Sequence, residues 1–391
     1  MSSTSLRGNQ HIVQPGGLIA ILGGGQLGRM TAMAARSMGY RVRVMDPEPA
    51  CPASFVADET IVGRWDDVAA ARRLGSGADA VTLEIEQIGV EALAEVAALT
   101  PLRPAVEPVR IIQDKTLQKT WLAENGFPVG AFRVVRSKAE LQEAVAALGG
   151  RVFLKIGRGG YDGRGQARIG LDAPATGEAV AAAWHGIGAR PAVAEQALDL
   201  ECEISVMAAR NPGGEVLSYP AARNHHVNQI LDWSVLPAGV PAELESRAQT
   251  LASDISAKLG IEGLLCAEMF VTRGGELYVN ELAPRPHNSY HQSERGCVTS
   301  QFEQLVRTTC NLPLGDTSLI TPCAVANLLG DEWLNRATPP NFAAAMAVPG
   351  VRVHLYEKHT PRAGRKMGHL SSVGATAEDA LARVLEARRR L

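Results

Sequence analysis

The sequence lacks long apolar runs, and none approaches the ~20 residues that a membrane-spanning helix requires. It also has little excess charge, with a formal net charge of −2 at pH 7 and an isoelectric point of about 6.5. Because nucleic acids and anionic membranes attract strongly basic proteins, this balance argues against both as partners. The first residues contain no apolar signal-peptide segment, so we expect residues 1–15 to form a disordered tail.

Paired cysteines are missing as well. The six cysteines are scattered, and no two of them form a Cys-x-x-Cys pair. Zinc sites and disulfide frameworks use paired or regularly spaced cysteines, so the scatter argues against both and favours reduced thiols in a cytoplasmic enzyme. At 391 residues, of which 46% are hydrophobic, the chain is long enough for two or three globular domains.

Glycine, by contrast, is concentrated in two places. The first, Gly23 to Gly28, lies between an apolar strand at 18–22 and a helical stretch that ends at Gly39. Its spacing, Gly-x-Gly-x-x-Gly, is typical of a β–loop–α–β unit whose helix N-terminus binds a phosphate group. A nicotinamide-dependent dehydrogenase is one alternative, with Asp46 as the ribose-binding acid. A tight turn that only lets the helix pack close to the sheet is another.

Two further strands are predicted at 59–62 and 79–86. Residues alternate along the second, so Glu84 and Glu86 face away from its apolar side, near the carboxyl end of the strand. Open α/β sheets bind ligands at that edge, which makes both glutamates candidate binding residues. A solvated strand end explains Glu84 equally well, whereas Glu86, nearer the end, is the stronger candidate.

The second concentration of glycine follows a short strand at 152–154. Lys155 comes next, and five glycines then fall within nine residues, from Gly157 to Gly165. Such a loop loses much chain entropy on folding unless it wraps a ligand, and the usual ligand is a polyphosphate held by amide groups and a lysine. A flexible surface hairpin would explain the glycines but not Tyr161, Asp162 and Arg164 set between them.

The dipeptide Gly274-Gly275 predicts a two-residue β-hairpin. In that register Glu268 falls directly opposite Glu281. Facing like charges destabilise a sheet, so we infer that the two carboxylates bind a divalent cation, for which carboxylate oxygen is a preferred ligand.

The alternative for this pair is two exposed glutamates that point into water. We expect the neighbours Phe270, Leu277 and Val279 to be buried on the same face, which argues against exposure. In the same register Leu277 pairs with Thr272, and Asn280 points to the opposite face.

Three other segments carry candidate residues. The segment 113–119 starts an amphipathic helix that reaches Gly126, and Lys115 within it is, taken alone, a surface charge. The acidic connector at 196–201 suits an adenine edge and a ribose, although a generic hairpin explains it too. The polar loop at 283–289 follows the proposed metal strand, so His287 is either a site residue or a surface histidine.

From Leu319 onward we expect a small third unit. Strands are predicted at 322–329 and 351–356, and an amphipathic helix closes the chain from Thr376. The basic, glycine-containing loop at 357–369 either binds an anionic substrate or is a solvated turn.

Together these segments resemble the ATP-grasp ligases and, within them, the N5-carboxyaminoimidazole ribonucleotide synthases of bacterial and fungal purine biosynthesis. The motifs that carry the resemblance are Gly-Gly-Gln-Leu-Gly-Arg-Met30, Glu84-Ile-Glu86, Gly159-Gly-Tyr-Asp-Gly-Arg-Gly-Gln166, Asn280-Glu-Leu-Ala-Pro-Arg-Pro-His-Asn-Ser289 and Ala363-Gly-Arg-Lys-Met-Gly-His369. The resemblance implies a mixed α/β and α+β fold. Its parts would be a Rossmann-like pre-ATP-grasp domain at 16–112, an ATP-grasp domain at 113–318 with a cover subdomain at about 125–200, and a small β-rich domain at 319–391.

The resemblance also implies that ATP phosphorylates bicarbonate to carboxyphosphate, which carboxylates the exocyclic amine of 5-aminoimidazole ribonucleotide. Mg²⁺ or Mn²⁺ would be held by Glu268 and Glu281. ATP would contact Lys115, Lys155, Gly160, Tyr161, Asp162, Gly163, Arg164, Gly165, Gln166, Glu195, Gln196, Ala197, Leu198, Glu203, His226, Asn280 and Glu281. The ribonucleotide would contact Gln26, Leu27, Glu86, Asn288, Ser289, Lys358, Arg365 and Lys366. The residues implied in catalysis are Tyr161, Arg164, Glu86, His287 and Lys358.

Two positions depart from the family. Lys115 stands where arginine is frequent, which keeps the charge but loses the fork geometry, and the connector at 197–200 is more apolar than usual. The resemblance further implies a homodimer that acts on small molecules. A formate-dependent glycinamide ribonucleotide transformylase would share the ATP site but not Tyr161, His287 and the 364–369 loop, and a non-catalytic nucleotide sensor would share the fold without turnover.

Overall fold

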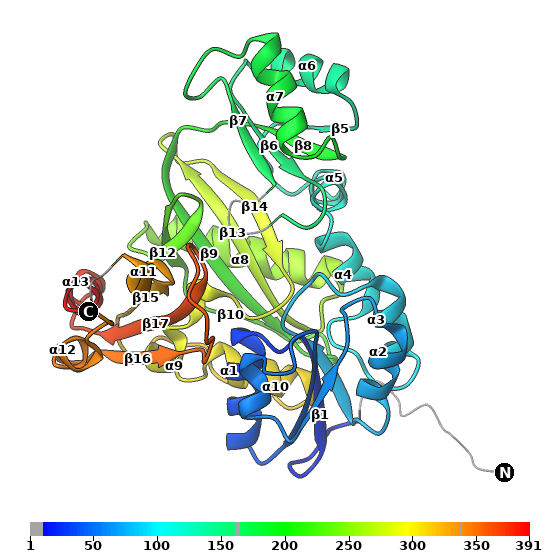
Figure 1. Ribbon diagram of the computed structural model, residues 1–391, viewed down its shortest axis with the longest axis vertical. Helices are drawn as coiled ribbons and strands as arrows, with labels where there is room; N and C mark the ends of the chain where they lie inside the picture. Colours follow the sequence, from blue (N-terminus) through cyan, green and yellow to red (C-terminus); the bar gives the residue numbers. More distant parts are fainter. Residues whose placement is uncertain (1–10, 161–164, 336–337) are drawn as a thin grey trace.

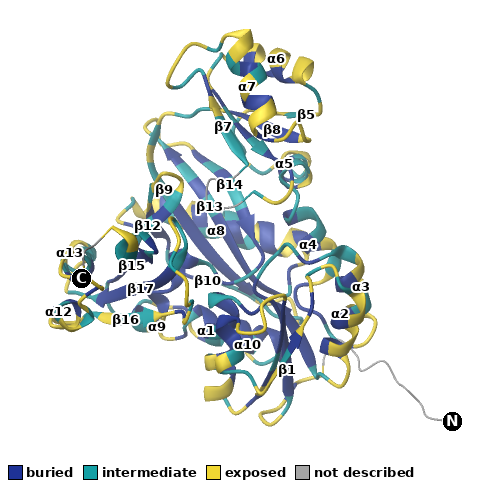
Figure 2. Cartoon of the chain, in the orientation of Figure 1, coloured by how far each residue is buried: buried dark blue, intermediate teal, exposed yellow. Residues whose placement is uncertain are grey.

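The computed structural model describes residues 11–160, 165–335 and 338–391, which form three β-sheets with helices packed around them (Figure 1). An N-terminal sheet has four strands, a central sheet has nine, and a smaller four-stranded sheet, the cover sheet, stands beyond one end of the central sheet. Figure 2 shows buried residues concentrated on the central strands, whereas the helices on the cover sheet expose their outer faces. The expected mixed α/β and α+β fold is confirmed.

The N-terminal sheet is parallel, with the strand order β3-β2-β1-β4. Its strands are β1 Leu18–Leu22, β2 Arg41–Asp46, β3 Glu59–Val62 and β4 Ala80–Leu83. Its helices are α1 Gln26–Ser37, α2 Val68–Gly75, α3 Val90–Ala97 and α4 Val106–Ile112, with a 3-10 helix, η1, at Pro52–Phe55. All residues of β1 and β4 are buried, as is typical of a parallel sheet covered on both faces. The strand predicted at 79–86 is shorter than expected, because β4 ends at Leu83.

Glu84 follows β4 directly and fills the first glycine loop. Its carboxylate accepts hydrogen bonds from the amides of Gly25 (2.7 Å) and Gly28 (2.9 Å), at the N-terminus of α1. A Cβ on Gly25 would lie 2.7 Å from Glu84 Oε1, so only glycine allows this approach. Asp46 likewise accepts the amide of Gly24 at 2.9 Å. The amides of Gly24, Gly25 and Gly28 therefore bind the chain's own acids and not a phosphate, which corrects that prediction. Asp46 and Glu84 are structural residues of the glycine loop. The predicted ribose contact of Asp46, and both the ligand role and the solvated strand end considered for Glu84, are therefore wrong.

The cover sheet has the strand order β5-β8-β6-β7. Its strands are β5 Phe132–Val135, β6 Val152–Ile156, β7 Gln166–Ile169 and β8 Ala192–Gln196, and its helices are α6 Lys138–Ala147 and α7 Gly177–Gly186. Apolar side chains from both helices pack with those of the strands, among them Leu141, Val180 and Leu154. The other helices of the described residues are α5 Lys115–Glu124, α8 Ala242–Leu259, η2 Asn288–Tyr290, α9 Ser293–Gly296, α10 Gln301–Thr309, α11 Asp331–Leu334, α12 Phe342–Met346 and α13 Ala377–Arg389.

The central sheet includes strands from both the middle and the end of the chain, in the order β14-β13-β9-β11-β12-β15-β17-β16, with β10 paired to β9. Its strands are β9 Leu200–Arg210, β10 Val216–Ser218, β11 Ala222–Val227, β12 Ile230–Leu236, β13 Gly263–Thr272, β14 Leu277–Ala283, β15 Cys323–Leu329, β16 Arg352–Leu355 and β17 Lys366–Val373. Because β12 pairs with β15, the C-terminal strands continue the central sheet. The loop predicted at 357–369 is wrong from Lys366 onward, where β17 begins. The domain boundaries given above stay predictions.

The hairpin of β13 and β14 contains a bulge that the sequence did not predict. Near the turn, Leu277 pairs with Val271, one residue away from the predicted partner. Asn280 is then an extra residue on β14, and it shifts the register so that Glu268 pairs with Glu281 as predicted.

The faces of the hairpin also differ from the prediction. Leu277 and Val279 lie in the apolar core between α8 and the sheet, together with Met269. Phe270 lies on the other face with Glu268, so the expected burial of Phe270 beside Leu277 and Val279 is wrong.

Replacing Glu84 with alanine should destabilise the N-terminal domain, because the amides of Gly25 and Gly28 lose their acceptor. We expect the free energy of unfolding in urea to fall by about 2–4 kcal/mol, since each donor left without an acceptor costs roughly 1–3 kcal/mol. The exposed Glu143 on α6, replaced by alanine, is the control and should change this free energy by less than about 0.5 kcal/mol. Equal effects of the two substitutions would contradict the role of Glu84.

Candidate active site

A cavity of about 680 Å³ lies between the cover sheet and the central sheet. The predicted site residues that line it are Glu86, Lys115, Lys155, Gly160, Gly165, Gln166, Glu195, Gln196, Leu198, Glu203, His226, Glu268, Asn280, Glu281, His287, Asn288 and Lys366. The structure therefore brings residues from the N-terminal, central and C-terminal parts of the chain to one place.

Several predicted residues lie apart from this lining. They are Gln26, Leu27, Ala197, Ser289, Lys358 and Arg365. Lys358 Nζ donates to Gln26 Oε1 at 2.8 Å, so the C-terminal loop reaches the start of α1. Arg365, in the same C-terminal loop, lies 4.0 Å from Glu48, which belongs to the N-terminal part of the chain. Tyr161, Asp162, Gly163 and Arg164 fall outside the described residues.

Two lysines share one buried carboxylate on the cover side of the cavity. Lys155 Nζ lies 3.1 Å from Glu195 Oε2 and 3.0 Å from Asn280 Oδ1, and Lys119 Nζ lies 3.5 Å from the same Glu195 oxygen. Burial raises the pKa of Glu195, but the two ammonium groups outweigh it and hold that pKa below its usual value. The bond from Lys155 shows that Asn280 faces the cavity, which corrects its predicted orientation.

Sequence reasoning missed Lys119. Its side chain is 4% exposed, and burial lowers its pKa to about 8, although Glu195 opposes the shift. The available signal was its spacing of four residues from Lys115, which puts the two ammonium groups on one face of α5. A buried lysine with a lowered pKa in a cavity is a candidate functional residue.

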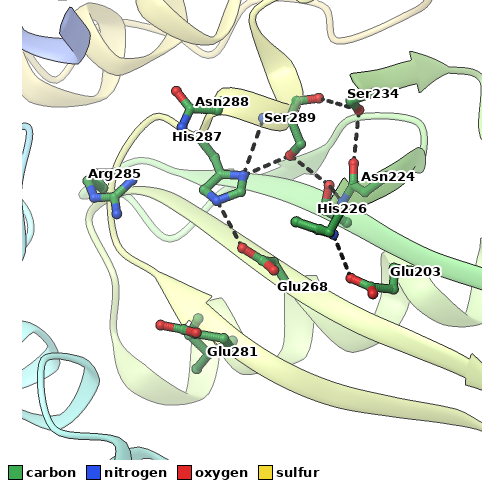
Figure 3. A network of polar contacts seen from close by, with 12 residues as sticks. Glu203, Asn224, His226, Ser234, Glu268, Glu281, Arg285, His287, Asn288 and Ser289 are labelled. Atoms are coloured by element: carbon green, nitrogen blue, oxygen red, sulfur yellow. Dashed lines mark hydrogen bonds and ion pairs between the residues drawn. The ribbon is translucent and has the colours of Figure 1, made fainter. Parts of the chain in front are cut away.

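On the opposite wall, Glu268 pairs with His287 (Figure 3). The two side chains are 2.9 Å apart, and Ser289 Oγ lies 2.8 Å from the other ring nitrogen of His287. Burial opposes the charge on His287, but the Cys266 sulfur and the Glu268 carboxylate outweigh it and raise the pKa of His287. His287 is therefore an imidazolium at neutral pH.

Ser289 and His226 show how neighbours orient these groups. The Ser289 hydroxyl is fully buried between His287 and Ser205, so it positions the histidine, and its predicted substrate contact is not supported. His226 lies 2.8 Å from Glu203, which raises the pKa of His226 against the effect of burial.

The facing carboxylates Glu268 and Glu281 each have a cationic partner. Glu281 contacts Lys115 Nζ, as Glu268 contacts His287. Their repulsion is offset without a metal, which corrects the inference that this pairing requires one. Their oxygens, on adjacent strands (Figure 3), nonetheless fit Mg²⁺, which prefers carboxylate ligands and keeps positions for phosphate oxygens and water.

Arg285, in the loop after β14, is a second residue that the sequence did not single out. Its guanidinium contacts both carboxylate oxygens of Glu86, with Nη2 3.1 Å from Oε1. Burial raises the pKa of Glu86, but Arg285 outweighs it and lowers that pKa, so Glu86 is ionised. Arg285 lies within the 280–289 motif, but no feature of the sequence indicates its partner, which is 199 residues away.

A histidine cluster lies behind the substrate side of the cavity. Ligand atoms of Glu294, His354 and His369 lie within 4.8 Å of one another. The rings of His354 and His369 are stacked, however, with centroids 4.5 Å apart and planes at 11°, so their in-plane lone pairs do not converge on one ion. His369 also stacks on His291, whose Nε2 lies 2.9 Å from Asn288 Oδ1. The cluster therefore supports Asn288 by packing.

Family models match all three parts of the chain. They describe a ribonucleotide synthetase preATP-grasp domain at 17–113, an ATP-grasp domain at 120–302 and a phosphoribosylaminoimidazole carboxylase C-terminal domain at 323–383. The fold and the cavity therefore define an ATP-grasp enzyme, and the dehydrogenase alternative is wrong.

Individual relatives narrow this class. The N5-carboxyaminoimidazole ribonucleotide synthase of Bacillus subtilis is 39% identical over 363 residues, which cover 93% of each chain. A crystal structure of an N5-carboxyaminoimidazole ribonucleotide synthetase with ADP has a TM-score of 0.90 at 38% identity, covering 96% of this chain and 97% of the other. The Aspergillus clavatus N5-carboxyaminoimidazole synthase with ADP and 5-aminoimidazole ribonucleotide has a TM-score of 0.86 at 28% identity, covering 98% and 100%. The chain belongs to the N5-carboxyaminoimidazole ribonucleotide synthase family of ligases. Among the helices that the structure describes, none has the length and apolar character needed to span a bilayer.

Lys119 should make stability depend on pH. Its pKa is about 8 in the folded protein against 10.5 when exposed, so the folded state binds this proton less tightly than the unfolded state does. The cost of burying the charge is present below pH 8 and decreases as the pH rises toward 10.5. Relative to Lys119→Met, the free energy of unfolding of the wild-type protein in urea should rise by about 2 kcal/mol between roughly pH 7.5 and 9.5. A difference that stays constant over this range would contradict the lowered pKa.

Proposed function

We propose that the protein carboxylates 5-aminoimidazole ribonucleotide with bicarbonate in an ATP-dependent step of purine biosynthesis. ATP phosphorylates bicarbonate to carboxyphosphate and leaves as ADP. The exocyclic amine of the ribonucleotide then attacks the carboxyl carbon, loses a proton and releases phosphate, which gives N5-carboxyaminoimidazole ribonucleotide. One observation carries the proposal: a single cavity joins the lysines and glutamates of a nucleotide site to Glu86, His287 and Lys366. The ADP and ribonucleotide complexes of the relatives support it.

On the nucleotide side, Lys115 and Lys155 balance the charge of the ATP phosphates. Gly160, Gly165 and Gln166 belong to the loop that covers them. The connector at 195–198 meets the adenine and Glu203 the ribose hydroxyls, with His226 beside them. Lys115 acts as a point charge, so it lacks the bidentate phosphate geometry that an arginine would supply.

Glu268 and Glu281 are the residues that would hold Mg²⁺ or Mn²⁺, with Asn280 Oδ1 as a neutral oxygen nearby. A bound divalent ion would spread the charge of the transferring phosphoryl group. With a divalent ion on these carboxylates, Lys115 and His287 would be available to phosphate oxygens. The chain's own contribution is therefore a set of cations and carboxylates that exchange partners.

On the substrate side, Lys358, Arg365 and Lys366 bind the ribonucleotide phosphate. Gln26 and Leu27, which begin α1, are the N-terminal residues assigned to the same phosphate. The contact between Lys358 and Gln26 supports this placement, because it joins the C-terminal loop to the N-terminus of α1.

The aminoimidazole ring lies near Glu86, His287 and Asn288. Ionised Glu86 accepts a hydrogen bond from the exocyclic amine and orients it, whereas protonated His287 donates to a carboxyl or phosphate oxygen. The roles of Tyr161 and Arg164 toward bicarbonate stay predictions. Closing the cavity over carboxyphosphate would protect it from hydrolysis by water.

We also propose that the enzyme is a cytoplasmic homodimer. All six cysteines are free and five of them are buried, which suits a reducing compartment. The homodimer rests on the family resemblance alone, and light scattering on the purified protein measures it directly.

The first test is ADP release with Mg-ATP, with ribonucleotide and bicarbonate added separately and together. We expect release to depend on 5-aminoimidazole ribonucleotide and to yield a carboxylated product when bicarbonate is present. Turnover with formate and glycinamide ribonucleotide instead would overturn the substrate while keeping the enzyme class. No turnover with either pair would favour a nucleotide sensor.

Replacing Glu281 with glutamine should abolish activity with the fold intact, because one charged metal ligand is lost while the side-chain volume is kept. We expect kcat for ADP release to fall at least about 100-fold. Glu276→Gln, an exposed position in the same hairpin, is the matched control and should keep wild-type turnover. ADP production in Glu281→Gln at the wild-type rate, with an unchanged circular dichroism spectrum, would refute the metal assignment.

Replacing Lys358 with methionine should weaken ribonucleotide binding selectively. A lost cation–phosphate contact of roughly 1.5–3 kcal/mol corresponds to a KM for the ribonucleotide about 10- to 150-fold higher. The KM for ATP should change less than about twofold, and Lys258→Met on the exposed face of α8 should change neither. A parallel rise in both KM values would contradict the assignment of Lys358 to the ribonucleotide phosphate.

A further inference from the structure

Helix α5 holds the edge strand β14 on both sides of its bulge. Gln118 Oε1 accepts the amide of Leu282 at 3.0 Å, and Gln118 Nε2 lies 3.4 Å from the carbonyl oxygen of Leu282. On the other side of Asn280, Lys119 Nζ donates to the carbonyl of Val279 at 3.2 Å. An edge strand presents backbone groups that need partners, and α5 supplies them here. The residues between the two contacts are Asn280 and Glu281, which face the cavity.

The same ammonium group takes part in an uneven charge cluster. Lys119 and Lys155 both approach Oε2 of Glu195, at 3.5 and 3.1 Å, while Glu195 Oε1 is buried without a hydrogen-bond partner among the described residues. Two ammonium groups and one carboxylate leave a net charge of one positive unit. Without Lys119, Glu195 would neutralise Lys155 completely.

We propose that Lys119 is a positioning residue for ATP. Its ammonium shares Glu195 with Lys155, so the charge of Lys155 stays available to the polyphosphate. Its bond to Val279 also fixes the bulge that presents Asn280 and Glu281. The inference rests on the proposed assignment of this cavity to ATP and its divalent ion, and not on the identity of the second substrate.

A purely structural role for Lys119 predicts something different. A buried lysine that only fills space could be replaced by methionine, which has a similar length and shape, without effect on nucleotide binding. Lys119→Met should fold, because Lys155 still neutralises Glu195 and no buried charge is left unpaired. Any loss of nucleotide affinity in this variant therefore reports on charge and position.

The experiment compares Lys119→Met with the surface control Lys138→Met, which removes the same charge at an exposed position. Calorimetric titration with Mg-ADP should give a dissociation constant at least about tenfold higher for Lys119→Met and within about twofold of wild type for the control. In turnover, the KM for ATP should rise at least as much, and the KM for the ribonucleotide should change less than about twofold. Equal ADP affinity in wild type and Lys119→Met would overturn the proposal. So would a parallel loss of affinity for both substrates accompanied by a lower melting temperature.

A double variant tests the charge argument separately. Lys119→Met combined with Glu195→Gln restores the net positive unit around Lys155, so it should bind Mg-ADP more tightly than Lys119→Met alone. If the double variant binds Mg-ADP no more tightly than Lys119→Met alone, Lys119 does not act through Glu195. ADP binding needs no ribonucleotide, so these outcomes remain readable if the wild-type enzyme proves to act on another second substrate.

Discussion

The structure of this site depends on the pairing of buried charges. Five carboxylates line the cavity, and each contacts a cation from a different element: Glu86 with Arg285, Glu195 with Lys155, Glu203 with His226, Glu268 with His287, and Glu281 with Lys115. Removing one partner of a largely buried pair, such as Glu86 with Arg285, would leave an uncompensated charge, which is strongly destabilising. Glu86 with Arg285 also ties the N-terminal part of the chain to the central sheet, and Glu281 with Lys115 ties α5 to it. A charged ligand that enters this cavity meets ions that are already partly desolvated, which lowers the cost of binding.

Much of the fold could be predicted from local sequence. Strand β1 begins and ends where the apolar run at 18–22 does, because a buried parallel strand is apolar throughout. Strand β4 was expected to reach Glu86, and it stops at Leu83 because Glu84 turns to bind the glycine amides of α1. That contact joins residues 59 and 56 positions apart, and no local pattern encodes it.

The candidate site was predicted by residue type more successfully than by orientation. The pairing of Glu268 with Glu281 was expected and is present. The predicted register is wrong near the turn, however, and the bulge at Asn280 restores it at the two glutamates. A one-residue insertion of this kind depends on the contacts that α5 makes with β14, which the sequence of the hairpin does not contain. Lys119 was missed for a related reason, because its burial is set by a strand 160 residues away.

The different connections of the two outer parts have a mechanical consequence. The C-terminal strands share a continuous hydrogen-bonded ladder with the central sheet through β12 and β15, so they form one stiff plate with it. Within the described chain, the cover sheet has no strand paired to that plate. The chain enters the cover sheet at 125–131, between α5 and β5, and leaves it at 197–199, between β8 and β9. A rotation about these two connections would break no ladder, so the two sheets can turn relative to each other without loss of strand pairing. The cavity lies between the two sheets, so such a rotation would change its width.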